Sequence, residues 1–186
     1  MARKVLVPIA DGSEEMEAVC MIDLLRRAGA DVTVASVDEL QVTAARGVRL
    51  VADRLIADCA SQTYDLIALP GGMPGAEHLR ASGTLEALLR RQHGEGRLYA
   101  AICAAPVVVL QDLGLLAGRH ATCHPSVADQ LENAESLTAR VVVDGNCITS
   151  RGPGTAVEFA LKLVELLYDA DKARQVADHA LVASVP

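Results

Sequence analysis

Several segments of the chain are apolar almost throughout, and most of them are followed by a segment in which apolar residues recur with helical spacing. The pattern predicts strands at 5–10, 31–37, 64–70 and 97–102, and helices at 14–29, 84–96, 105–116, 153–169 and about 171–183. Strands that are apolar on both sides are typical of a parallel sheet with helices on both faces. The fold class that we expect is therefore a doubly wound α/β fold.

Two further segments predict short strands outside this alternation. Residues 139–150 are expected to form two strands around Asp144-Gly145, which is a common hairpin turn, so the sheet should be mostly rather than wholly parallel. Residues 42–53 suggest two short extended pieces around Arg46-Gly47. We find no internal repeat and no linker rich in Pro, Gly or Ser, and we expect one domain over 1–186.

In doubly wound sheets, chemistry gathers at the carboxyl ends of the strands. That rule selects three positions: Asp11-Gly12 after the first strand, Gly71-Gly72 after the strand at 64–70, and Cys103 after the strand at 97–102.

Cys103 lies where a strand passes into a helix through a very short turn. Such a turn, as in the nucleophile elbow of hydrolases, needs small residues two positions before and two positions after the nucleophile. Ala101 and Ala105 occupy these positions. A helix N-terminus favours an anion, so we expect a lowered thiol pKa and a nucleophilic Cys103. The alternative is that Cys103 is a small residue of the core.

Two other positions could assist that thiol. Glu17 starts the apolar stripe of its helix, which continues at Met21 and Leu24, so its carboxyl should be buried, with a raised pKa suited to general acid–base chemistry. The alternative is a glutamate that only favours the helix dipole, the role we expect for Glu14 and Glu15. The amides of Gly71-Gly72 could form an oxyanion nest, or the pair could be a plain tight turn.

The segment RHATCHPSV at 119–127 carries His120, Cys123 and His124. Before Pro125 the segment is expected to be extended, which places the two histidines about 13 Å apart. One metal could not then bind both, so we expect no metal site and no cofactor. His124 is the better candidate for a histidine close to the thiol.

Composition excludes several classes of function. The net charge is −7, and the chain has no Trp, one Phe and three Tyr, which argues against binding of nucleic acid. The five cysteines include no CxxC pair and are expected to be free thiols of a cytoplasmic protein. No run of 18 apolar residues occurs, and the N-terminal apolar run is too short for a signal peptide.

The motifs ADGSEEMEAV, LPGGMPGA, AAICAAP, CHP and TSRGPGTAVEFAL, in this order, resemble the ThiJ/PfpI superfamily and most closely its YajL-like branch. The resemblance covers nearly the whole chain. It implies a flavodoxin-like sandwich and a homodimer. It also implies a set of site residues: the nucleophile Cys103, its acidic partner Glu17, the nearby His124, oxyanion amides at Gly71, Gly72 and Ala104, and arginines of the pocket or dimer interface at Arg46, Arg26 and Arg151.

Two departures from relatives narrow this interpretation. In the protease-like branch the cysteine is followed by a histidine, whereas here Ala104 follows, which argues against peptidase activity. In related glutamine amidotransferases the histidine is supported by an acidic residue two positions on, whereas here Ser126 stands there. A complete catalytic triad is therefore not expected.

The leading functional hypothesis is a cysteine-dependent deglycase and glutathione-independent glyoxalase. Its substrates would be methylglyoxal, glyoxal or their early adducts on proteins and nucleotides, with Cys103 as nucleophile and Glu17 as proton carrier. One alternative is an oxidative-stress sensor and redox-linked chaperone that works through oxidation of Cys103. A further alternative from the superfamily is an isonitrile hydratase or amidase.

Overall fold

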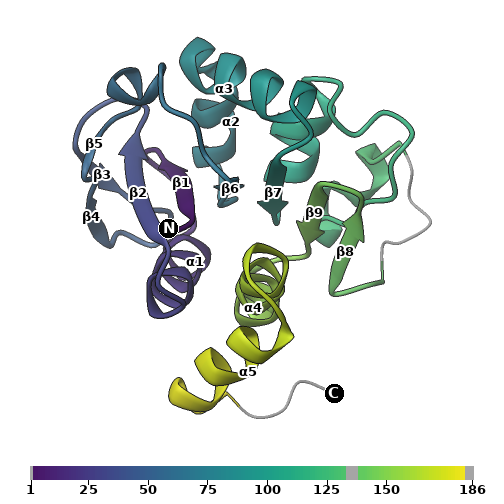
Figure 1. Ribbon diagram of the computed structural model, residues 1–186. Coiled ribbons are helices and arrows are strands. Elements are labelled where there is room, and N and C mark those ends of the chain that lie inside the picture. The colour runs from purple at the N-terminus through teal and green to yellow at the C-terminus, as the bar shows by residue number, and fades with distance from the viewer. Residues whose placement is uncertain (1, 133–137, 183–186) are drawn as a thin grey trace.

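A seven-stranded sheet between two layers of helices forms the body of the computed structural model, which describes residues 2–132 and 138–182 (Figure 1). The strand order is β5-β2-β1-β6-β7-β9-β8, and every neighbouring pair is parallel except β8 with β9. The strands are β1 (Lys4–Ile9), β2 (Asp31–Ser36), β5 (Arg54–Leu55), β6 (Leu66–Leu69), β7 (Leu98–Ile102), β8 (Val141–Asp144) and β9 (Cys147–Ser150). The doubly wound α/β fold expected from the sequence is confirmed.

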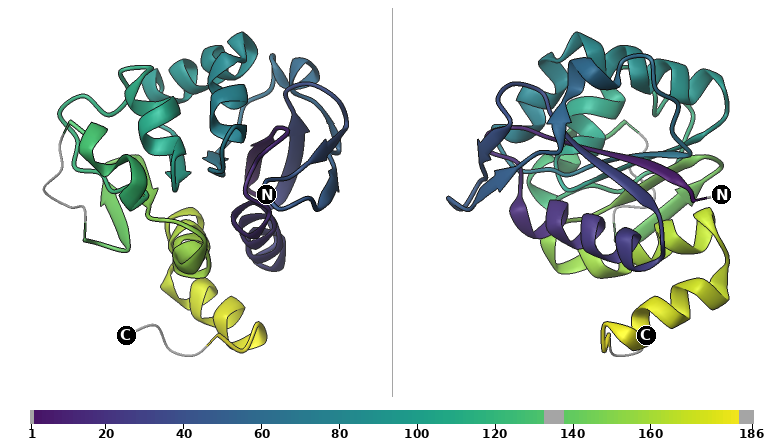
Figure 2. Two further views of the ribbon diagram at one scale, coloured as in Figure 1. Left: turned by 180° about the vertical axis from the view of Figure 1, so that it is seen from behind. Right: turned by 60° about the vertical axis from the view of Figure 1, so that its left-hand side comes forward.

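Each face of the sheet carries its own apolar core. On one face, α1 (Glu15–Arg27) and α4 (Ala156–Leu167) pack together, and α5 (Ala170–His179) packs on α4 and projects from the body (Figure 2). On the other face lie α2 (Gly75–Ala81), α3 (Gly83–Gly94) and the π-helix η2 (Pro106–Gln111). The central strands are apolar throughout because both of their faces are buried.

Most predicted elements are present. The hairpin predicted at 139–150 is β8–β9 at the edge of the sheet, and the short pieces predicted at 42–53 are β3 (Gln41–Thr43) and β4 (Arg49–Val51), an antiparallel pair outside the main sheet. Four short elements of the described residues were not predicted: α2, β5 and the 3₁₀-helices η1 (Ile56–Cys59) and η3 (Pro125–Gln130).

The helix predicted at 105–116 is only partly present. A π-helix spans Pro106–Gln111, and turns follow it. A Schellman-type cap ends this segment: the Leu115 amide donates to the Leu110 carbonyl and the Gly114 amide to the Gln111 carbonyl, both at 2.8 Å. The intervening Gly114 has a positive φ of 73°, which is incompatible with a continuing helix. Within the described residues, no helix is long and apolar enough to cross a membrane.

Candidate active site

The carboxyl ends of β1, β6, β7 and β9 bring four loops to one edge of the sheet. The Glu14 amide donates to the Gly71 carbonyl at 2.9 Å, and this bond joins the loop after β1 to the loop after β6. The Cys103 amide donates to the Ser150 carbonyl at 3.0 Å, which joins the turn after β7 to the end of β9. The three positions selected from the sequence therefore lie at one edge, as a parallel sheet requires.

Cys103 occupies the sharp turn between β7 and η2, with a φ of 67°. This left-handed conformation is costly for a residue with a side chain, and such residues concentrate at functional sites. Ala101, Ala104 and Ala105 are buried around it. Gly71 lies directly against the turn, because a Cβ placed on Gly71 would be 2.6 Å from the Cys103 Cβ. The small residues therefore allow the turn, and the thiol stays partly exposed.

The Glu17 side chain is fully buried beside this thiol. Its Oε2 atom accepts a hydrogen bond from the Gly71 amide at 2.7 Å. In the described chain no N–H or O–H donor reaches its Oε1 atom, and the group beside the carboxyl is the Cys103 thiol. Burial raises the pKa of Glu17 to about 7, although the Gly71 amide and the Cys103 thiol lower it. The expected buried carboxyl with a raised pKa is therefore present.

The expected lowering of the thiol pKa is wrong. Burial and the negative charge of Glu17 raise the pKa of Cys103 to about 12, and they outweigh the amides of Gly72 and Ala104, which lower it. The sequence could indicate the amides but not how deeply the thiol is buried. Glu17 is uncharged when it is protonated, and its charge then no longer raises the pKa of Cys103. The titrations of Glu17 and Cys103 are therefore coupled.

The backbone amides of Gly72 and Ala104 hydrogen-bond with the Cys103 sulfur. Gly72 has a φ of 85°, and a Cβ there would be 2.4 Å from the Glu14 nitrogen. Only glycine at this position therefore allows the loop after β6 to lie so close to the loop after β1. The Gly71 amide instead donates to Glu17. Of the three oxyanion candidates, Gly72 and Ala104 are placed to stabilise an anion at the sulfur, whereas Gly71 orients the carboxyl.

His124 contacts Cys103 by a backbone hydrogen bond. Its amide donates to the Cys103 carbonyl at 2.8 Å, and its ring lies beside Gly152. The Nδ1 atom is 2.8 Å from the hydroxyl of Ser126, the residue that stands where an acidic residue supports the histidine in the amidotransferases. The described residues show no hydrogen bond between the imidazole and the sulfur. Nor does the described chain bring three His, Cys, Asp or Glu side chains together as a metal site would require.

The three candidate arginines lie in different places. Arg46 is exposed in the turn of the β3–β4 hairpin. Arg26 is nine residues beyond Glu17 on α1, about 13 Å along the helix, and pairs with Asp53 at 3.0 Å. Arg151 follows β9 at the edge that carries Cys103, and its buried Nε has no partner among the described residues. Only Arg151 therefore lies on the strand end that contacts the thiol turn.

Glu15 has a role that the sequence analysis missed. It was expected only to favour the helix dipole, but its carboxylate is buried and accepts hydrogen bonds from the amides of Arg46, at 2.9 and 3.1 Å, and Val48, at 3.4 Å. It holds the hairpin turn against the start of α1. The run of three glutamates at 14, 15 and 17 was the only available signal, and it does not show which of them faces a loop.

Known proteins resemble this chain in sequence and in fold. The family model described as "DJ-1/PfpI family" matches residues 3–166. Protein DJ-1 homolog B of Arabidopsis thaliana is 49% identical over 177 residues, which are 94% of this chain but only 40% of that relative. A Caenorhabditis elegans relative described as glutathione-independent glyoxalase DJR-1.2 is 40% identical over 170 residues, 90% of this chain and 89% of that relative.

The solved structures include a close counterpart. The structure described as Toxoplasma gondii DJ-1, oxidized, has a TM-score of 0.95 and 51% sequence identity, and the match covers 98% of this chain and all of that one. The family model spans most of the chain, and the resemblance seen in the sequence motifs is to this same superfamily. The chain belongs to the DJ-1/PfpI family.

Proposed function

We propose that this protein is a cysteine-dependent glyoxalase that needs no glutathione and that also removes early dicarbonyl adducts, as a deglycase. The observation that carries the proposal is the buried Glu17 carboxyl beside Cys103, with a pKa of about 7. A group with that pKa can both accept and release a proton near neutral pH, as an isomerisation requires. The relative described as a glutathione-independent glyoxalase supports the same reaction.

The reaction is an internal redox exchange, so it needs no external oxidant or reductant. Glu17 accepts the thiol proton while the Cys103 sulfur bonds to the aldehyde carbon of methylglyoxal. Glu17 then passes that proton to the aldehyde oxygen, which gives a hemithioacetal and leaves Glu17 as a base again. Glu17 then moves a proton from that carbon to the neighbouring carbonyl carbon, through an enediol, which leaves a thioester of lactate. Water hydrolyses the thioester, lactate leaves, and the thiol regains its proton. The amides of Gly72 and Ala104, which contact the Cys103 sulfur, would act as donors to an oxyanion on the carbon bonded to it.

Deglycation would use the same attack on a dicarbonyl already attached to an amine, a guanidinium or a thiol. The Cys103 sulfur–carbon bond replaces the bond between that carbon and the macromolecule, whose leaving group takes the thiol proton through Glu17, and the later steps are unchanged. Substrates of this proposed activity are small reactive aldehydes and glycated proteins or nucleotides.

The decisive experiment measures methylglyoxal consumption together with lactate appearance, in metal-free buffer without glutathione. Wild type should turn over and Cys103→Ser should not. Cys20→Ser is the matched control, because Cys20 is also a partly exposed thiol but lies on α1. Equal turnover in wild type and Cys103→Ser would refute the proposal.

A second candidate function is an oxidative-stress sensor and redox-linked chaperone. It is favoured by the partial exposure of Cys103 and by the relative whose structure is described as oxidized. Intact mass after mild peroxide treatment tests it: the sensor requires Cys103 to gain oxygen before the other four thiols. Turnover absent in wild type, together with selective oxidation of Cys103, would favour this function over the enzyme.

We also propose a cytoplasmic homodimer. Met16 and Val19 on α1 and Val48 and Val51 on the hairpin are exposed apolar residues, and Val51 is 70% exposed. The five free cysteines, Cys20, Cys59, Cys103, Cys123 and Cys147, suit a reducing compartment. Sedimentation of wild type and Val51→Asp tests the dimer, because a charge in an apolar interface should shift the protein towards the monomer.

A further inference from the structure

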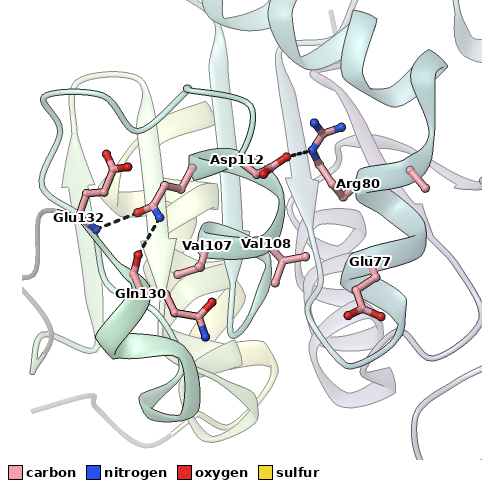
Figure 3. A pocket seen from close by; sticks show the side chains of 9 residues that line it. Glu77, Arg80, Val107, Val108, Asp112, Gln130 and Glu132 are labelled. Atoms are coloured by element: carbon pink, nitrogen blue, oxygen red, sulfur yellow. Dashed lines mark hydrogen bonds and ion pairs between the residues drawn. The ribbon is translucent and has the colours of Figure 1, made fainter.

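A groove with a volume of about 700 Å³ lies between α2 and η2, on the face of the sheet opposite α1 and α4 (Figure 3). The side chains of Val107 and Val108 line it from η2, and residues 130 and 132 close its other side. The two helices that form its walls start next to the proposed active site in the chain, α2 three residues after Gly72 and η2 three residues after Cys103.

The walls of the groove are held by bonds between elements. The side-chain amide of Gln111 donates to the Gln130 carbonyl at 2.8 Å, and its oxygen accepts from the Glu132 amide at 2.9 Å (Figure 3). Both ends of this side chain are therefore satisfied, and they tie η2 to the segment at 130–132. The groove exists before any ligand arrives, which reduces the entropy lost on binding.

The charges that face the groove are mostly negative. Arg80 is its only cation among the lining residues, and that guanidinium is already paired with Asp112 and with Glu86. The carboxylates of Glu77 and Glu132 have no ion-pair or hydrogen-bond partner in the part of the chain that the structure describes. The two residues stand on opposite sides of the groove, with Glu132 beyond the Gln111 side chain (Figure 3). A ligand that fills this groove would therefore meet two unpaired negative charges above an apolar floor.

We propose that this groove binds a polypeptide segment in which a lysine or arginine stands beside an apolar residue, and that it holds such a segment while a modified residue reaches Cys103. The basic side chain would pair with Glu77 or Glu132, and the apolar one would cover Val107 and Val108. The role at Cys103 rests on the proposed function, whereas the binding itself does not.

Other ligand classes fit the groove less well. A polyamine would satisfy the two carboxylates but would gain little from the valine floor. A nucleic acid would bring phosphates towards unpaired carboxylates, in a chain whose net charge is already −7. A peptide with both basic and apolar side chains can pair with the carboxylates and also cover the valine floor.

Binding is tested first without catalysis. A fluorescently labelled peptide containing Lys-Leu-Lys is titrated with Cys103→Ala protein, and anisotropy is measured. The double variant Glu77→Gln/Glu132→Gln should weaken binding about five- to tenfold, because two exposed ion pairs are lost. The control Glu39→Gln/Asp58→Asn changes the net charge equally at exposed positions outside the groove and should leave the affinity unchanged.

A second variant tests whether the peptide occupies the groove itself. Ala81 is an exposed lining residue at the end of α2, so Ala81→Trp should fill the groove without disturbing the core. It should abolish peptide binding while thermal unfolding stays at the wild-type temperature. The proposal is overturned if both groove variants bind the peptide as wild type does, if the charge control weakens binding as much as the double variant, or if spermidine binds as tightly as the peptide.

Turnover separates this inference from the proposed function. With catalytically intact protein, Glu77→Gln/Glu132→Gln should raise KM for a methylglyoxal-modified basic peptide about five- to tenfold and leave kcat/KM for free methylglyoxal unchanged. If neither substrate is turned over by wild type, the proposed function fails while the peptide titration still decides the groove.

Discussion

Gly71 faces Cys103 between the neighbouring strands β6 and β7 so closely that a methyl group on Gly71 would lie 2.6 Å from the Cys103 Cβ and 2.9 Å from the Ile102 carbonyl oxygen. The same glycine donates its amide to Glu17 at 2.7 Å. One residue thus sets the space around the thiol and the orientation of its acidic neighbour. This contact joins the packing of the fold to the proposed chemistry.

The first prediction concerns Gly71→Ala. The added methyl group meets backbone atoms that cannot rotate away, so the free energy of unfolding should fall by about 1–3 kcal/mol and turnover of methylglyoxal should fall sharply. Urea unfolding and lactate formation measure the two effects. Gly83→Ala is the control, because nothing lies within 4 Å of its added Cβ at the start of α3, and it should keep both properties. Full activity of Gly71→Ala would contradict the close approach.

The second prediction concerns the pH dependence of stability. The pKa of Glu17 is raised to about 7 in the folded protein from about 4.5. In that interval the folded state binds more protons than the unfolded state, so this residue's contribution to stability is complete below about pH 4.5 and declines as the pH rises through 7. Relative to Glu17→Gln, which remains neutral, wild type should lose up to about 3 kcal/mol across this range.

Glu86→Gln provides a control of opposite sign. A hydrogen bond from Arg90 lowers the pKa of Glu86, so the stabilising effect of Glu86 is lost as the pH falls. Wild type should therefore gain stability relative to Glu86→Gln as the pH rises. Parallel unfolding curves for wild type and Glu17→Gln at every pH would mean that the Glu17 carboxyl is not held in its neutral form.

The third prediction separates the reactivity of the thiol from catalysis. The Glu17 charge is one of the causes that raise the pKa of Cys103 to about 12. Glu17→Gln removes that charge, so the midpoint of iodoacetamide alkylation at Cys103 should move to lower pH, while kcat for methylglyoxal should fall about a hundredfold or more. Cys20, on the same helix as Glu17, gives an internal reference rate. A variant that gains thiol reactivity and keeps full turnover would show that Glu17 carries no proton.

The elements of the site could be predicted to different degrees. The position of Cys103 followed from an apolar strand that ends among alanines, and the burial of Glu17 followed from the spacing of Met21 and Leu24, because both signals are local. The direction of the Cys103 pKa could not be predicted, because it depends on how deeply two residues from distant segments are buried together. The Arg80–Asp112 pair depends in the same way on the packing of α2 against η2, and α2 is too short to show a clear apolar period.

Glu15 is the clearest case of a residue whose role depends on a distant loop, and it carries the fourth prediction. Its carboxylate accepts hydrogen bonds from the Arg46 and Val48 amides, and a hydrogen bond to a charged group contributes about 1.5–3 kcal/mol. Glu15→Ala should therefore loosen the hairpin turn, and hydrogen exchange at these two amides should accelerate well above that of the sheet. Glu15→Gln keeps one acceptor and should lie between the two proteins. Glu39→Ala, which removes an exposed carboxylate just before β3, should leave both exchange rates unchanged. If the amides of Arg46 and Val48 exchange equally slowly in all four proteins, the hairpin is held by its own strand pairing and Glu15 does not position it.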